Sequence, residues 1–219
     1  MKKICICGGG SLGHVIAGYL SANGKATVSI LTNHPTAWQN KIEICVPDNG
    51  EMLIGNIACV SANPAEALLD AEIVLLCLPG FLIKDELIKI RDFINSGTYV
   101  GSVFSSTGFF FEALKLLNED IPLWGFQRVP FISRIKEYGH SASLLGYKGC
   151  YHIAVERDTD ANKELFRYWV ENSFDRPVTL LKNYLEASLT NSNPLLHTAR
   201  LYSMFHDWQP GISYPRNIL

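Results

Sequence analysis

The chain has 219 residues, of which 47% are hydrophobic and 18% are charged. This composition supports a sizeable core, and it excludes intrinsic disorder and a small fold that depends on metals or disulfides. The formal net charge of −2 is dispersed, without a dense run of Lys or Arg, so it indicates no nucleic-acid partner and favours a small-molecule partner.

The start of the chain predicts a βαβ unit. Residues 3–7 form a short apolar run that is typical of a strand, and residues 12–23 carry apolar side chains at helical spacing. A second apolar run follows at 27–31. A strand, a glycine-rich turn, a helix and a strand within about 30 residues are the parts of such a unit.

The same alternation continues along the chain. We expect a hairpin at Asn49-Gly50 and an unbroken, doubly covered parallel strand at 73–78. The other predicted strands are 42–46, 52–60, 99–104, 123–126, 149–155 and 177–181, and the predicted helices are 64–70, 83–94, 109–118 and 161–171. The pattern predicts an α/β fold, a doubly wound Rossmann-type sheet with helices on both faces.

The character of the sequence changes after Lys182, where the apolar spacing becomes helical at 184–189 and again at 193–208. We expect Asn193 to cap the second of these helices and Pro194 to occupy its first position. The predicted organisation is a dinucleotide-binding Rossmann domain over 1–185, followed over 186–219 by the start of a helical substrate or catalytic domain, which we expect to be incomplete.

The turn after the first strand contains a Gly-x-Gly-x-x-Gly pattern. In Rossmann domains the first glycine allows a tight turn, the second lets the backbone approach a pyrophosphate, and the third lets the helix pack closely on the sheet. The phosphates then lie on free N–H groups at the helix N-terminus. The predicted cofactor-binding residues of this turn are Gly8, Gly10, Ser11, Leu12 and Gly13.

The end of the second strand bears on which dinucleotide binds. A site for NAD usually has an acidic residue there for the ribose hydroxyls, whereas residues 31–35 of this chain contain no carboxylate. Thr32 and Asn33 can donate hydrogen bonds to a 2′-phosphate, so NADP is the predicted cofactor and NAD the alternative. Leu78 and Pro79 end a strand of the same sheet and are predicted to border the cofactor.

Cellular location and metal content follow from the cysteines and the apolar runs. The six cysteines form no CxxC pair, which predicts reduced, buried thiols and no metal site. No run approaches the ~18 apolar residues of a membrane span. We therefore expect a cytoplasmic protein without a membrane partner.

Hydride chemistry needs a proton donor or acceptor near the nicotinamide, and histidine is suited to that role near neutral pH. Spacing alone does not choose among the six candidates, which are His14, His34, His140, His152, His197 and His206.

A resemblance narrows this choice. The run Asn193-Pro194-Leu195-Leu196-His197 resembles the Asn-Pro-x-x-His motif that opens the second domain of the octopine/nopaline (opine) dehydrogenase family. Residues 126–135, 137–139 and 145–149 also resemble segments of that family. With the glycine turn and the Leu78-Pro79 corner, the resemblance covers essentially the whole chain.

The resemblance implies a reductive condensation, in which an amino acid and an α-keto acid form an imine that NAD(P)H reduces to a secondary amine. It implies that His197 is the general acid/base, that Asn193 contacts substrate, and that the helix begun by Asn193 and Pro194 aims His197.

The sequence departs from the family in one respect. Family members carry a full helical second domain, whose later part supplies a carboxylate partner for the histidine, and no Asp or Glu after His197 matches that partner. We therefore expect a fragment, a truncated product or a remnant that another subunit completes. The apolar side chains of 186–219 are expected to form an exposed face or a homo-oligomer contact.

Two alternatives remain open. One is a ketopantoate-reductase-like enzyme that reduces a 2-keto acid, which requires a Lys acid in a helical second domain, although no Lys follows Lys182. The other is a noncatalytic NAD(P)-binding module, which the short chain and the unmatched carboxylate favour.

Overall fold

The centre of the protein is an eleven-stranded sheet, as seen in a computed structural model that describes residues 1–211 apart from the side chain of Pro194. The strand order is β11-β10-β7-β6-β5-β1-β2-β4-β3-β9-β8. The strands are β1 (Lys2–Cys7), β2 (Ala26–Leu31), β3 (Lys41–Val46), β4 (Glu51–Ser61), β5 (Ile73–Leu76), β6 (Tyr99–Ser102), β7 (Leu123–Phe126), β8 (Phe131–Glu137), β9 (Ser141–Tyr147), β10 (Tyr151–Glu156) and β11 (Val178–Leu180).

The six central strands, in the order β4-β2-β1-β5-β6-β7, are parallel to one another, whereas β3 and β10 pair in antiparallel fashion with the outer two, β4 and β7. This is the strand order of a Rossmann-type sheet, so the predicted fold class is confirmed. The helices are α1 (Ser11–Ala22), α2 (Pro64–Ala67), α3 (Gly80–Ile90), α4 (Phe109–Leu116), α5 (Asp160–Phe174), α6 (Tyr184–Leu189) and α7 (Asn193–Phe205), with short 3₁₀ turns at Pro35–Ala37, Arg91–Phe93 and Ser105–Thr107.

Alternating side chains of the buried strands build two apolar layers. In β1, Ile4 and Ile6 face the layer that α1 and α5 complete, whereas Cys5 and Cys7 face the layer that α3, α4 and α6 complete. All four side chains are at most 1% exposed. Helices on both faces explain why residues 4–7 of β1 and all of β5 are apolar and buried, because parallel strands of this kind have no solvent-facing side.

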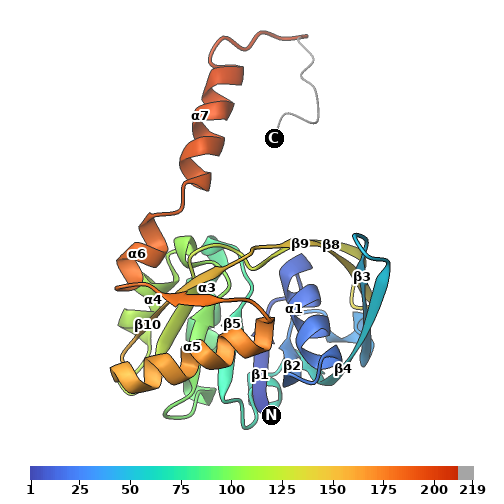
Figure 1. Ribbon diagram of the computed structural model, residues 1–219, viewed down its shortest axis with the longest axis vertical. Coiled ribbons are helices and arrows are strands. Elements are labelled where there is room, and N and C mark those ends of the chain that lie inside the picture. Colours follow the sequence, from blue (N-terminus) through green and yellow to red (C-terminus); the bar gives the residue numbers. More distant parts are fainter. Residues whose placement is uncertain (212–219) are drawn as a thin grey trace.

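The sequence prediction missed β8 and β9. They form an antiparallel ribbon whose strand β9 pairs in parallel with β3, so that the sheet continues around α1 (Figure 1). The alternation of β8 is inverted, because Ser133 is buried while its neighbour Ile132 is half exposed. A strand with a polar inward side chain and an apolar outward one gives no amphipathic pattern for a sequence analysis to detect.

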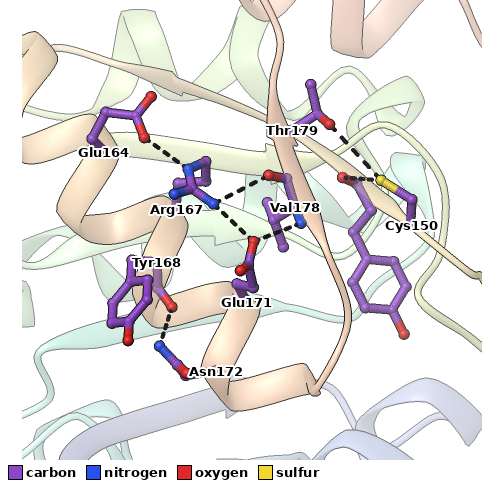
Figure 2. A network of polar contacts seen from close by, with 9 residues as sticks. Cys150, Glu164, Arg167, Tyr168, Glu171, Asn172, Val178 and Thr179 are labelled. Atoms are coloured by element: carbon purple, nitrogen blue, oxygen red, sulfur yellow. Dashed lines mark hydrogen bonds and ion pairs between the residues drawn. The ribbon is translucent and has the colours of Figure 1, made fainter.

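The far edge of the sheet is fixed to α5 by a polar network (Figure 2). The Arg167 guanidinium contacts the carboxylates of Glu164 at 2.7 Å and Glu171 at 2.8 Å. Glu171 in turn accepts a hydrogen bond from the backbone N–H of Val178 at 3.0 Å. The short strand β11 is therefore held by side chains of α5 as well as by its pairing with β10.

The last two helices differ in how they contact the rest of the protein. Helix α6 packs against β10 and β7 and buries Ala187 and Ser188. Helix α7 projects away from the sheet (Figure 1), and none of its described side chains is buried. The expected exposed apolar face is present, with Leu195 75% and Leu196 64% exposed.

The predicted cap of α7 is wrong by one residue. Ser192 is the N-cap residue, and Asn193 is the first residue of the helix. The reason lies upstream, where Asn191 accepts the backbone N–H of Asn193 on its own Oδ1 at 3.1 Å. The buried Asn191 thus satisfies the first N–H of the helix from outside the cap position, and Asn193 is left exposed at the start of the helix.

None of the helices in the described part of the chain combines the length and the apolar content that crossing a membrane requires.

Candidate functional site

The glycine turn joins β1 to α1 at the carboxyl edge of the sheet. Gly8 has φ +117°, a backbone conformation that favours glycine, and a Cβ there would lie 2.7 Å from the carbonyl oxygen of Cys77. A Cβ on Gly13 would lie 2.2 Å from the carbonyl oxygen of Gly8. Both glycines therefore serve the tight turn and the close helix packing that the pattern predicted.

Gly10 differs from these two glycines, because a Cβ added there meets no atom within 4 Å. It is the N-cap residue of α1, whose N-terminus carries no side-chain cap and no acidic residue in its first turn. An uncapped helix N-terminus next to open space leaves N–H groups and the positive end of the helix dipole available to an anion. The geometry fits a pyrophosphate at this position.

Two hollows flank the turn. The larger, about 720 Å³, lies at the carboxyl ends of β1, β5 and β6 and extends beneath the β8–β9 ribbon. Its lining includes the predicted residues Gly10, Ser11, Leu12, Leu78 and Pro79, together with Ser106, Thr107 and Arg134, which the sequence analysis did not select. Arg134 is the one Lys or Arg among the described lining residues, and it forms no ion pair within residues 1–211.

The smaller hollow, about 160 Å³, lies on the other side of the turn. Thr32 and Asn33, two of the predicted cofactor-binding residues, line it beside Gly8, Leu78 and Tyr138. The Thr32 hydroxyl is buried and lies 3.2 Å from the Tyr138 hydroxyl, so Thr32 is partly engaged by the ribbon. Helix α3 adds Glu86 and Lys89, two charged side chains that the sequence analysis overlooked because they lie more than 50 residues from β2.

His14 connects the glycine turn to the β8–β9 ribbon. Its ring is fully buried, with Nδ1 2.9 Å from the carbonyl oxygen of Gly10 and Nε2 2.7 Å from the amide nitrogen of Gly139. A neutral imidazole protonated on Nδ1 satisfies both contacts, since Nε2 must accept the Gly139 N–H. Burial lowers the pKa of His14, and the Gly10 carbonyl opposes this effect in part.

The β8–β9 ribbon, which His14 holds through Gly139, contributes lining residues to both hollows. Tyr138, next to Gly139, contacts the His14 ring edge-on at a centroid distance of 5.2 Å and lines the smaller hollow. Arg134, earlier in the ribbon, lines the larger one. His14 is therefore a positioning residue and has no open face toward a ligand.

Cys77 lines the larger hollow but is not suited to act as a nucleophile. Its side chain is buried, and burial raises its pKa far above the usual thiol value, so the thiol remains protonated. The described cysteines are all free, and residues 1–211 contain no group of three side chains suited to hold a metal ion.

The structure does not bring His197 or Asn193 to these hollows. Both lie on the projecting helix α7 and are exposed, and neither lines a hollow beside the glycine turn. Asp207, the carboxylate nearest in sequence, pairs instead with Nε2 of His206 at 2.7 Å. Within the described residues, the two hollows beside the glycine turn and the predicted general acid/base are therefore separate.

Comparison with known proteins gives relatives over nearly the whole chain, although no protein-family model matches it. An uncharacterized protein of Sinorhizobium fredii is 28% identical, and the match covers 95% of this chain and 58% of the relative. Tauropine dehydrogenase of Arabella iricolor is 26% identical, with 95% and 56% covered. Octopine dehydrogenase of Pecten maximus is 22% identical, with 94% and 55% covered.

Solved structures share the fold. Octopine dehydrogenase with NADH and agmatine superposes with a TM-score of 0.82 at 20% identity, covering 99% of this chain and 57% of that one. Yersinopine dehydrogenase with NADP⁺ gives 0.64 at 16% identity, covering 86% and 49%. A 2-dehydropantoate 2-reductase from Porphyromonas gingivalis gives 0.70 at 15% identity, covering 94% and 72%.

These matches confirm the resemblance to the opine dehydrogenases, which are NAD(P)-dependent oxidoreductases. The chain spans somewhat more than half the length of the curated relatives that it matches.

Proposed function

We propose that this chain is the cofactor-binding part of an opine-type NAD(P)-dependent dehydrogenase. The observation that carries the proposal is the glycine turn, where Gly8 and Gly13 close the packing while Gly10 and the uncapped α1 N-terminus face open space. The residues proposed to hold the cofactor are Gly8, Gly10, Ser11, Leu12, Gly13, Thr32, Asn33, Leu78 and Pro79. Hollows on both sides of the turn give room for the two halves of a dinucleotide.

We further propose that NADP is preferred over NAD. The end of β2 offers Thr32 and Asn33 and no carboxylate, so no acidic side chain at that position repels a 2′-phosphate. Among related folds, yersinopine dehydrogenase is known with NADP⁺ and octopine dehydrogenase with NADH, so the fold accommodates both.

The proposed reaction is the reductive condensation of an amino acid with an α-keto acid through an imine. The molecules bound in structural neighbours support this proposal, since octopine dehydrogenase structures contain L-arginine or pyruvate with NADH. The bound cofactor supplies the hydride. In the chain, Arg134 supplies a positive charge beside the α1 N-terminus, suited to a pyrophosphate or to a substrate carboxylate.

For catalysis we propose His197 as the general acid/base and Asn193 as a substrate contact. Both lie on α7, which we assign to the start of a second domain over residues 186–219. Because His197 has no carboxylate partner within residues 1–211, turnover requires a partner for α7, supplied by further chain or by a second copy. A homo-oligomer through the exposed apolar side chains of α7 is one form of that partner.

A cytoplasmic location is also proposed. Cys5, Cys7 and Cys77 are buried and unpaired, which is ordinary for thiols in a reducing compartment.

A ketopantoate-reductase-like activity is the second candidate, favoured by the 0.70 TM-score of the 2-dehydropantoate 2-reductase. The two reactions differ in whether the amino acid is consumed.

The test is an assay of NADPH oxidation with pyruvate, in the presence and absence of a panel of amino acids. The proposal predicts oxidation that depends on the amino acid, a secondary-amine product by mass spectrometry, and loss of both in His197→Ala with NADPH binding retained. Oxidation that proceeds equally well without an amino acid would favour the keto-acid reductase. Cofactor binding by the chain without turnover, even when further chain or a second copy covers α7, would indicate a noncatalytic module.

A further inference from the structure

The smaller hollow beside the glycine turn contains one cationic and one anionic side chain among its described lining residues. These are Lys89 and Glu86, three residues apart on α3 and therefore on one face of that helix. They face Thr32 and Asn33, which lie at the end of β2. The charged side chains of this hollow thus come from α3. The residues after β2, from which cofactor choice is usually predicted, are uncharged here.

Both side chains are largely withdrawn from solvent, with exposed fractions of 32% for Lys89 and 17% for Glu86. Their charged groups are 3.9 Å apart, which is longer than a hydrogen bond. Within residues 1–211 the ammonium group of Lys89 makes no hydrogen bond, so its three donors remain available. By contrast, the hydroxyl of Thr32 already lies within hydrogen-bond distance of Tyr138.

We propose that Lys89 is the residue that admits a 2′-phosphate into this hollow, with Glu86 as its positioning partner and as the group that limits the preference for NADP. This inference rests on the proposed function, because it assumes that the adenosine end of the cofactor occupies the smaller hollow. Lys89 is then the side chain that determines cofactor choice, whereas the absence of a carboxylate after β2 identifies no such side chain.

The charge balance of the pair gives the direction of each effect. A phosphate brings up to two negative charges, which the ammonium of Lys89 attracts and the carboxylate of Glu86 repels. Burial raises the pKa of Glu86, while Lys89 opposes that rise. The neutral form of Glu86 is thereby favoured relative to an exposed carboxyl, which reduces the repulsion. An adenosine with a free 2′-hydroxyl lacks this charge and is affected much less by either side chain.

The experiment is a calorimetric titration with two probes that isolate the adenosine end, adenosine 2′,5′-bisphosphate and 5′-AMP. Lys89→Met is expected to weaken the bisphosphate by about ten- to a hundredfold, the loss of one charge-assisted hydrogen bond, and to change 5′-AMP by less than about twofold. Glu86→Gln is expected to strengthen the bisphosphate about threefold or more and to leave 5′-AMP nearly unchanged.

The chain offers matched controls on the same helix. Lys84 and Asp85 are exposed and do not line the hollow, so Lys84→Met and Asp85→Asn change the net charge of the protein by the same amounts at other positions. Neither control is expected to alter the ratio of the two affinities by more than about twofold, since exposed charges are screened.

The outcomes separate the inference from the proposed function. Equal weakening of both probes in Lys89→Met, or an unchanged ratio, would overturn the assignment of Lys89 while leaving cofactor binding intact. The same change of ratio in Lys84→Met would show a general charge effect and overturn it too. If the unaltered chain binds neither probe nor NADPH, the proposed cofactor site itself fails.

Discussion

The cofactor cleft and helix α7 are built in opposite ways. In the cleft, the position of nearly every group is determined by a neighbour from a distant part of the chain, as when His14 on α1 holds Gly139 of the ribbon. In α7, none of the described side chains is buried, and contacts such as that of His206 with the Tyr202 carbonyl join residues close in sequence. The proposed cofactor binding therefore depends on groups within this chain, whereas the proposed catalysis depends on what α7 contacts.

The largest change in the free energy of unfolding, and so the strongest test of this contrast between the cleft and α7, is expected at His14. His14→Ala leaves the Gly139 N–H and the Gly10 carbonyl without a partner in a buried site, and should lower the free energy of unfolding by on the order of 3 kcal/mol. Urea denaturation measures it. His206→Ala at the end of α7 is the control, with an expected change below about 0.5 kcal/mol. Equal changes in the two variants would refute the contrast.

Substitutions at Gly13 and Gly10 should affect different properties, the first the stability of the protein and the second its binding of the cofactor. A Cβ at Gly13 would overlap the Gly8 carbonyl, so Gly13→Ala is expected to cost about 2 kcal/mol of unfolding free energy. A Cβ at Gly10 enters open space, so Gly10→Ala should leave stability within about 0.5 kcal/mol. The same methyl group would occupy the place proposed for the pyrophosphate and weaken NADPH binding at least about tenfold. Tight NADPH binding by Gly10→Ala would contradict the site.

Stability should also depend on pH through His14. Its pKa in the folded protein lies below the ordinary value of 6.5, so the unfolded chain takes up the proton first. The contribution of His14 is therefore complete above pH 6.5 and decreases as the pH falls toward the folded-state pKa. Unfolding free energies of the unaltered chain and of His14→Gln, measured between pH 8 and pH 5, should converge at the acidic end. Parallel curves would show that His14 is not held neutral.

The smallest effects are expected on α7. Leu196→Ser replaces a side chain that is 64% exposed, and should change the free energy of unfolding by less than about 0.5 kcal/mol at low protein concentration. Sedimentation at increasing concentration shows whether the chain self-associates through this helix. A large loss of stability in the monomer would mean that α7 packs against the body in solution.

Much of this account could be predicted from the sequence, because it depends on local pattern. The unbroken apolar runs of β1 and β5 and the spacing of Gly8, Gly10 and Gly13 determine strand, turn and helix within short windows. The Leu78-Pro79 corner also lies where the strand order of a Rossmann sheet places it, beside the turn.

What the sequence did not predict depends on contacts between distant segments. Ser133 lies on the buried side of β8, so the strand lacks the regular alternation of apolar and polar side chains that a sequence analysis detects. His14 gains its role from Gly139, 125 residues away, and Glu86 and Lys89 line one hollow with Thr32 although they lie more than 50 residues from it in the sequence. The cap of α7 was misplaced by one residue because Ser192 and Asn193 are both suitable N-cap residues by type.

The most direct test of the central claim is a calorimetric titration of the 219-residue chain with NADPH and, separately, with NADH. The account predicts saturable binding of one dinucleotide per chain, with NADPH the tighter ligand, and the same affinities in His197→Ala. Absence of binding for both cofactors would contradict the claim that the glycine turn and its two hollows form a working site in this chain.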